Sequence, residues 1–174
     1  MEVLEFGCGT GSTAIAHAPY VKHICATDIS SKMIEIARRK ADAQGINNIT
    51  FEQSSIDALT LPDESLEAVL GHSILHLLEN KEEVIAKIHR TLKAGGVFVT
   101  TTVCLGDRMK FFKLIAPIGK YFGLLPTLKV FSVKQLEASL LKAGFSIDYQ
   151  WRPEKSHAVF IVAKKINSSS TLLD

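Results

Sequence analysis

Three glycines at alternating positions near the start of the chain constrain its fold more than any other feature. They are Gly7, Gly9 and Gly11, and they follow the short apolar segment 1–6. Residues 13–18 come next and are rich in alanine, so the pattern predicts a strand, a tight turn and a helix. Glycine permits positive φ angles and, without a Cβ atom, lets a ligand lie against the backbone. Taken alone, the three glycines are equally compatible with a flexible turn that binds nothing.

Two acidic residues beside this glycine loop favour a ligand-binding site. Asp28 closes the apolar run 23–27, which predicts a carboxylate at the carboxyl end of a second strand. In open α/β sheets an acid at that position accepts hydrogen bonds from ribose hydroxyls. Glu5 stands on the strand side of the loop, where its carboxylate suits an ammonium group or an ordered water better than a phosphate, which it would repel.

These residues resemble the cofactor site of the class I S-adenosylmethionine-dependent methyltransferases, and among them the broad small-molecule and quinone methyltransferase group. The resemblance rests on residues 5–11, followed by Asp28, Ile29, Ser30 and Met33. It continues through residues 51–53, 61–65, 75–77 and 92–96, and so covers about the first hundred residues.

The resemblance implies S-adenosylmethionine as the cofactor and S-adenosylhomocysteine as the product. The glycine loop is then expected to pack against the methionine and ribose portion, Glu5 to face the amino group, and Asp28 to bind the ribose hydroxyls. Ile29 is expected to cover one face of the adenine. The expected cofactor-binding residues are Glu5, Gly7, Cys8, Gly9, Gly11, Asp28, Ile29, Ser55, Ile56, Asp57 and His72.

The residues expected at the adenine edge depart from the family pattern. Many relatives carry an aspartate where this chain has Ser55. Ser55 still offers a hydroxyl and Ile56 a backbone N–H, while Asp57 is placed to substitute for the missing acid. The departure weakens the assignment at the adenine more than the assignment at the ribose.

His72 is the candidate catalytic residue. It follows an expected strand at residues 66–71, and in the family this place borders the transferred methyl group, so His72 is expected to position or deprotonate the acceptor. Methyl transfer from a sulfonium mainly requires alignment and the exclusion of water, so a base need not be present. His72 and His76 are spaced as a metal-binding pair, but no third ligand is visible, and no metal is expected.

The pattern of elements predicts an α/β fold, a Rossmann-like doubly wound and mostly parallel sheet with a C-terminal antiparallel hairpin strand. The expected strands after the first are 23–27, 48–52, 66–71 and 97–103, and the hairpin comprises 145–151 and 157–163. The expected helices begin at Ser30 or Ser31, at Asn80 and at Ser132. Residues 1–166 are expected to form one domain, with 104–131 a lid-like insertion after the fifth strand and 167–174 a flexible tail.

The insertion alternates basic and aromatic side chains. As a lid it would suit a hydrophobic acceptor, which is the preferred interpretation. Residues 108–131 could instead contact an anionic membrane surface, or form a helical pair packed on the sheet. An exposed apolar segment of this kind could also form a homodimer surface.

Composition excludes several classes of protein. The chain has 174 residues, of which 47% are hydrophobic, so disorder is not expected. A net charge of +2 is too small to indicate a nucleic-acid-binding protein, and residues 71–74 lack the Asn/Asp-Pro-Pro-aromatic motif of nucleobase methyltransferases. Three cysteines in apolar runs, with neither a signal peptide nor a membrane-spanning run, favour a cytoplasmic protein.

The sequence therefore predicts an S-adenosylmethionine-dependent methyltransferase that acts on a small, hydrophobic molecule. The family usually carries helices before the first strand, which this chain lacks, so a non-catalytic or truncated module of the same fold is the alternative. A nicotinamide-dependent oxidoreductase is less favoured, because its Gly-x-Gly-x-x-Gly fingerprint requires glycine where Ser12 stands.

Overall fold

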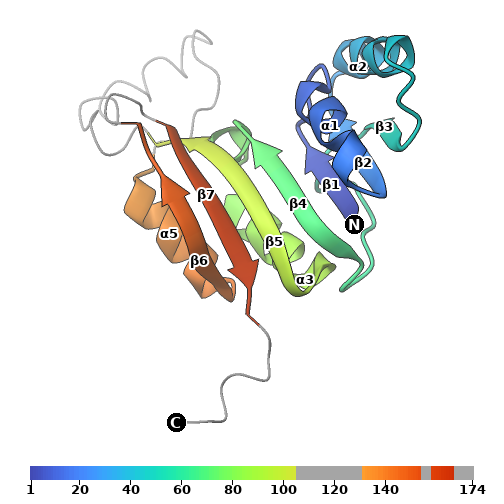
Figure 1. The fold of residues 1–174 in the computed structure, drawn as a ribbon. Helices are drawn as coiled ribbons and strands as arrows, with labels where there is room; N and C mark the ends of the chain where they lie inside the picture. Colours follow the sequence, from blue (N-terminus) through green and yellow to red (C-terminus); the bar gives the residue numbers. More distant parts are fainter. Residues whose placement is uncertain (105–130, 154–157, 167–174) are drawn as a thin grey trace, which may run out of the picture.

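A seven-stranded sheet runs through the whole computed structural model, which describes residues 1–104, 131–153 and 158–166. The strand order is β3-β2-β1-β4-β5-β7-β6, and Figure 1 shows the strands side by side. The strands are β1 (Glu2–Phe6), β2 (His23–Asp28), β3 (Ile49–Gln53), β4 (Leu66–His72), β5 (Leu92–Val103), β6 (Phe145–Trp151) and β7 (Ala158–Lys165).

The first five strands are parallel, and β7 lies antiparallel between β5 and β6. This arrangement confirms the predicted fold class, including the hairpin strand inserted antiparallel. The carboxyl ends of β1, β2, β3 and β4 all lie at one edge of the sheet, which is where open α/β sheets bind their ligands.

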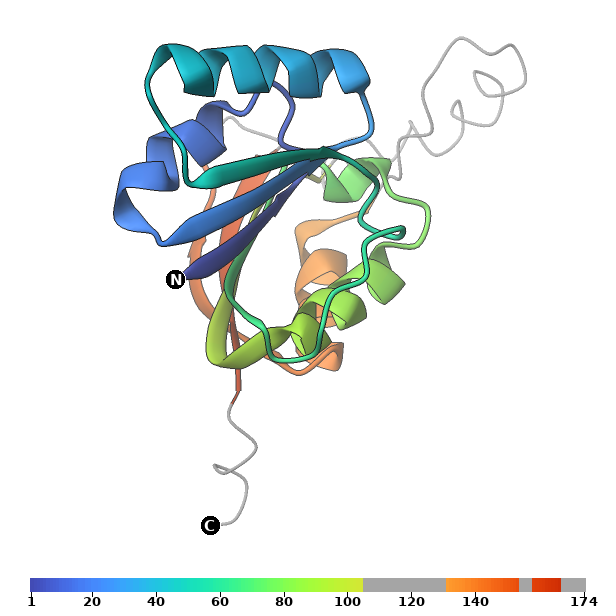
Figure 2. The same ribbon diagram turned by 90° about the vertical axis from the view of Figure 1, so that its right-hand side faces the viewer.

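Helices cover the two faces of the sheet in two separate groups. The helices are α1 (Ser12–His17), α2 (Ser31–Ala43), α3 (Lys81–Thr91) and α5 (Val133–Lys142). Short 3-10 turns occupy Ala18–Tyr20 and Leu75–Leu77. Figure 2 shows α1 and α2 on one side of the sheet and α3 and α5 on the other.

Each group of helices forms its own hydrophobic core with one face of the sheet. Alternation along a strand sends neighbouring side chains to opposite faces, so Val3 joins the core under α1 and α2, whereas Leu4 joins the core under α3 and α5. Ala68 and Val69 of β4 divide in the same way. The central strands are therefore apolar on both faces, as expected for buried parallel strands.

The predicted helix starts at Ser30 and Ser132 are confirmed. The hydroxyl of Ser30 accepts a hydrogen bond from the N–H of Met33, and Ser132 forms a reciprocal capping box with Gln135. Asn80 occupies the N-cap position of α3, but its side chain makes no capping bond. Its amide instead donates to the carboxylate of Asp57.

The prediction for the start of the fifth strand was wrong. β5 begins at Leu92 rather than at Val97, because Leu92 pairs with Leu66 before the register shifts. The four residues 93–96 fall within that irregular stretch, and Gly95 adopts a φ of 75° there. The strand thus resumes its pairing at Val97, after an irregular stretch that contains both glycines.

Several predictions concern residues outside the described part. Residues 105–130 of the predicted insertion lie outside it. The hairpin turn at residues 154–157 and the tail 167–174 also lie outside it. The lid, the membrane contact and the single-domain boundaries stay predictions. No helix among the described residues combines the length and the apolar character needed to span a membrane.

Candidate functional site

The glycine loop joins β1 to α1 through three left-handed residues. The φ angles of Gly7, Gly9 and Gly11 are 68°, 52° and 71°, a region that only glycine adopts readily. The N–H of Cys8 donates to the carbonyl of Thr27 at 2.9 Å, and the N–H of Gly11 donates to the carbonyl of Cys8 at the same distance. These bonds hold the loop against the end of β2.

The three glycines differ in the space around them. A Cβ atom on Gly11 would lie 2.8 Å from the ring of Phe51 and 2.9 Å from the Cβ of Ala37, so close packing requires glycine there. At Gly9 no heavy atom lies within 4 Å of the position of a Cβ atom. The space beside Gly9 is therefore open, which leaves its backbone accessible to a ligand.

Asp28 is fixed in place by two backbone donors. Its Oδ2 accepts from the N–H of Gly9 and its Oδ1 from the N–H of Ser30, each at 2.9 Å. The carboxylate thereby bridges the glycine loop and the start of α2. Because each carboxylate oxygen carries a further lone pair, Asp28 can still accept two hydrogen bonds from a diol.

Glu5 is buried, and one of its carboxylate oxygens lacks a hydrogen-bond partner among the described residues. Only 2% of the residue is exposed, and Oε2 has no hydrogen-bond partner among the described residues. Burial raises the pKa of this carboxyl to about 7, although a backbone hydrogen bond at Ala14 acts in the opposite direction. A cation brought beside Glu5 would supply the missing partner and favour the ionised form.

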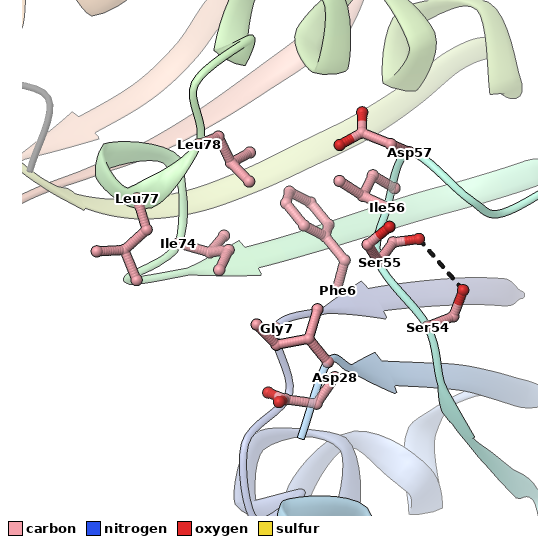
Figure 3. A pocket seen from close by; sticks show the side chains of 11 residues that line it. Phe6, Gly7, Asp28, Ser54, Ser55, Ile56, Asp57, Ile74, Leu77 and Leu78 are labelled. Carbon is pink, nitrogen blue, oxygen red and sulfur yellow. Dashed lines mark hydrogen bonds between the residues drawn. The ribbon is translucent and has the colours of Figure 1, made fainter. Parts of the chain in front are cut away.

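A pocket of about 160 Å³ opens at the carboxyl ends of β1, β2 and β3 (Figure 3). Six residues predicted for the cofactor site line it, namely Gly7, Asp28, Ile29, Ser55, Ile56 and Asp57. Five further lining residues were not predicted, namely Phe6, Ser54, Ile74, Leu77 and Leu78. Glu5, Cys8, Gly9, Gly11 and His72 do not line this pocket.

The missed residues make the pocket largely apolar. Ile74, Leu77 and Leu78 come from the segment between β4 and α3, and in Figure 3 they lie across from Ile56 and Ser55. Ile74 also packs against the glycine loop, since a Cβ atom on Gly7 would lie 3.0 Å from its side chain. The apolar character of residues 74–78 was the available signal, but it did not show what the segment faces.

The turn at residues 55–58 carries the opposite wall. Ser55 accepts a bond from the N–H of Ala58 with its hydroxyl at 3.2 Å, so the side chain stabilises the turn. Ile56 is buried in the core under α3. The carboxylate of Asp57 accepts a bond from the Asn80 amide at 3.0 Å.

His72 lies at the end of β4, apart from this pocket. Its Nδ1 is 3.0 Å from the hydroxyl oxygen of Thr101 on β5. Burial lowers the pKa of His72, and the nearby charge of His17 lowers it further. The imidazole therefore remains neutral at neutral pH, which is the form that can accept a proton.

The thiol of Cys8 is not activated for reaction. Its thiol is buried, and burial together with the negative charges of Glu5 and Asp28 raises its pKa to about 12. A thiol with so high a pKa stays protonated and is a poor nucleophile. In the described ranges, no three His, Cys, Asp or Glu side chains are grouped as a metal site.

The sequence and the fold are both similar to those of known methyltransferases. A family model described as a methyltransferase domain matches residues 3–96. An uncharacterized methyltransferase, YcgJ of Bacillus subtilis (strain 168), is 31% identical over 56% of this chain and 38% of its own length. The crystal structure of the YcgJ protein superimposes with a TM-score of 0.79 at 17% identity, over 95% of this chain and 92% of that one, which shows the fold.

Two further relatives carry names that specify a reaction. The malonyl-acyl-carrier-protein O-methyltransferase of Paenibacillus sp. (strain JDR-2) is 29% identical over 85% of this chain and 56% of its own length. The demethylmenaquinone methyltransferase of Bacteroides fragilis is 26% identical over 83% of this chain and 67% of its own length. The chain spans only 38% and 56% of the lengths of the first two relatives.

Proposed function

The chain belongs to the class I S-adenosylmethionine-dependent methyltransferase family, and from this premise we propose that it binds S-adenosylmethionine at the glycine loop and methylates a small, hydrophobic molecule. The observation that carries the proposal is the joint arrangement of the glycine loop, Asp28 and Glu5. Together they offer an open backbone, an oriented carboxylate and a buried acid that lacks a partner.

The residues present fit the cofactor. The open backbone at Gly9 accommodates the methionine and ribose portion, and Asp28 accepts from the ribose hydroxyls. Glu5 meets the positive amino group, directly or through water, which satisfies the acid that burial leaves poorly solvated. When bound, the cofactor supplies an activated methyl group on a sulfonium.

The pocket lined by residues 55–57 receives the adenine. Ile29 and Ile56 offer apolar surface for the faces of the ring, and the backbone and side chains of the turn offer polar groups for its edge. Asp57 takes part here despite its bond from Asn80, because a carboxylate accepts several hydrogen bonds. The apolar residues Leu77 and Leu78 exclude water from this wall of the pocket.

His72 orients the acceptor or removes its proton. Its neutral imidazole lies on β4, two strands from Asp28 in the sheet, at the same carboxyl edge. Thr101 fixes the ring through Nδ1, which leaves Nε2 to face an acceptor. A hydrophobic acceptor is supported by the similarity to a demethylmenaquinone methyltransferase, and an acyl-carrier-linked acid by the similarity to the malonyl enzyme.

Calorimetric titration of the purified chain with S-adenosylhomocysteine tests the proposal directly. NADH serves as the control ligand, because a glycine loop and an acid at position 28 could also serve a nicotinamide cofactor. Saturable binding of S-adenosylhomocysteine, without binding of NADH, is expected. Binding of neither ligand would contradict the proposal and support a non-catalytic module, and binding of NADH alone would support an oxidoreductase.

A further inference from the structure

The connection between β3 and β4, residues 54–65, contacts α3 at two places, in addition to the bonds within its own turns. Its second half is attached at the end of that helix. The N–H groups of Glu64 and Ser65 donate to the carbonyls of Arg90 and Thr91 at 3.0 and 2.9 Å. Arg90 also forms an ion pair with Asp63 at 2.9 Å.

The first half of the connection is anchored by the ammonium group of Lys87. Its Nζ donates to the carbonyl oxygens of Ile56, Asp57 and Leu59 at 2.8, 3.1 and 2.7 Å. An ammonium group has three N–H donors, so these carbonyls use its whole donor capacity. Hydrogen bonds from a charged donor are about twice as strong as neutral ones, which makes Lys87 a substantial anchor for this turn.

The turn that Lys87 anchors is also the wall of the pocket. Ser55, Ile56 and Asp57 all line it, whereas Lys87 itself does not. Asn80, at the other end of α3, holds the Asp57 carboxylate and so supports the same turn. α3 therefore supports this wall of the pocket at two points, and Lys87 makes three of the bonds involved.

We propose that Lys87 is a positioning residue that holds the 55–57 turn in the geometry needed to recognise the adenine edge. This inference rests on the proposed function, because it assigns the pocket to the adenine of the cofactor. Lys87 acts through the backbone that it binds and does not touch the ligand. Its removal should therefore affect recognition of the base rather than binding of the amino acid and ribose portions.

The test compares two ligands that differ only at the adenine edge. S-adenosylhomocysteine carries an exocyclic amino group, and S-inosylhomocysteine carries an oxygen in its place. The wild-type chain is expected to prefer the adenine compound at least about tenfold, the discrimination that about 1.4 kcal/mol provides. In Lys87→Met, affinity for the adenine compound should fall about tenfold, with little change for the inosine compound.

Arg90→Met provides a matched control. It removes a cation from the same helix that binds the same connection, but at Asp63, which does not line the pocket. Both affinities should remain within about twofold of wild type. Lys87→Arg, which retains the charge, should preserve part of the preference for adenine.

The other possible results separate the positioning role of Lys87 from the proposed function. Equal losses for both ligands in Lys87→Met, unchanged binding of both, or a wild-type chain that does not distinguish the ligands would overturn the positioning role while leaving the proposed function intact. A wild-type chain that binds neither ligand would overturn the proposed function itself. If Lys87→Met does not fold, Asn80→Ala removes the side-chain bonds to Asp57 and Glu83 and leaves Lys87 in place. That variant should lower the preference about threefold, and an unchanged preference would refute the proposal.

Discussion

Glu5 shows at the scale of one residue how a binding site can reduce the stability of the fold that carries it. Its carboxyl is buried without a partner on Oε2 among the described residues, and its pKa is raised to about 7 from an ordinary value of 4.5. Below about pH 4.5 the group is protonated whether the chain is folded or unfolded, so it has no effect on stability. Between about 4.5 and 7 the unfolded chain loses the proton first, and stability falls as pH rises. Above pH 7 the loss in the free energy of unfolding is constant, at about 3 kcal/mol.

Glu5→Gln should therefore stabilise the free protein at pH 8. Glutamine keeps the shape of the side chain without the buried charge, so the midpoint of thermal unfolding should rise by several degrees at pH 8 and hardly change at pH 4.5. Affinity for S-adenosylhomocysteine at pH 8 should fall about tenfold or more, because the cation loses its partner. Glu35→Gln, at an exposed position on α2, is the control, and a similar gain in that variant would refute the argument.

Asp28 is the second residue whose role can be separated from folding. Asp28→Ala removes both carboxylate oxygens that the glycine loop and α2 now bind, and it should weaken S-adenosylhomocysteine about a hundredfold. The residue is partly buried, so the folded chain should persist, as circular dichroism can confirm. An affinity within a factor of two of wild type would contradict the ribose assignment.

His72 should affect turnover rather than cofactor binding. Burial holds its pKa below the ordinary value, so the rate should fall only as the pH drops beneath about 6.5, when the imidazole gains a proton. With a hydrophobic acceptor, His72→Asn should lower the rate at which S-adenosylhomocysteine is formed about tenfold or more. Cofactor affinity should be nearly unchanged. Equal rates in variant and wild type would make His72 a wall residue only.

At the scale of the elements, the loop between β1 and α1 contains one glycine that is closely packed, Gly11, and one whose backbone is open, Gly9. Gly11→Ala would place a methyl group 2.8 Å from Phe51 in a left-handed conformation, so unfolding should become easier by about 2–4 kcal/mol. Gly9→Ala has the same backbone strain but open space around it, so it should cost about 1 kcal/mol. Denaturant unfolding measures both values.

The loss of ligand affinity should be larger in the variant that loses less stability. The methyl group at Gly9 enters the space that a ligand would occupy, so affinity should fall more in Gly9→Ala than in Gly11→Ala at equal folded fraction. Equal affinities in the two variants would mean that the ligand does not approach the loop at Gly9.

Local patterns in the sequence were sufficient to predict most elements. Ser30 and Ser132 mark helix starts by chemistry that acts over a few residues, and both predictions are confirmed. The start of β5 was missed because Leu92 pairs with Leu66 ahead of an irregular stretch, and pairing with another strand has no local signal in the sequence.

The parts of the site that escaped prediction depend on distant contacts. Lys87 lies on a regular helical face, and its partners are backbone carbonyls about thirty positions earlier, which have no signature in the sequence. Ile74 and Leu78 read as ordinary apolar residues until the fold brings them opposite Ile56. The strand, glycine turn and helix around Gly7, Gly9 and Gly11 could be predicted from local pattern, because the turn is formed by residues close together in the sequence.

At the scale of the whole molecule, the site lies where the two hydrophobic cores meet. Phe6 belongs to the core under α3 and α5, whereas Cys8, two residues later, belongs to the core under α1 and α2. A ligand that contacts the loop between them makes contacts with both halves of the fold. Its binding should therefore be coupled to global unfolding rather than to the opening of one loop.

S-adenosylhomocysteine should accordingly raise the midpoint of thermal unfolding as a single transition. At a concentration one hundred times its dissociation constant, a ligand that binds only the folded chain adds about 2.7 kcal/mol, which corresponds to a rise of roughly 5–10 °C for a chain of this size. Scanning fluorimetry across a ligand titration measures the shift, and Asp28→Ala, whose affinity is lowered, should require a proportionally higher concentration. A transition that splits in two, with only the first part moved by the ligand, would show that the two cores unfold separately and that the site belongs to one of them.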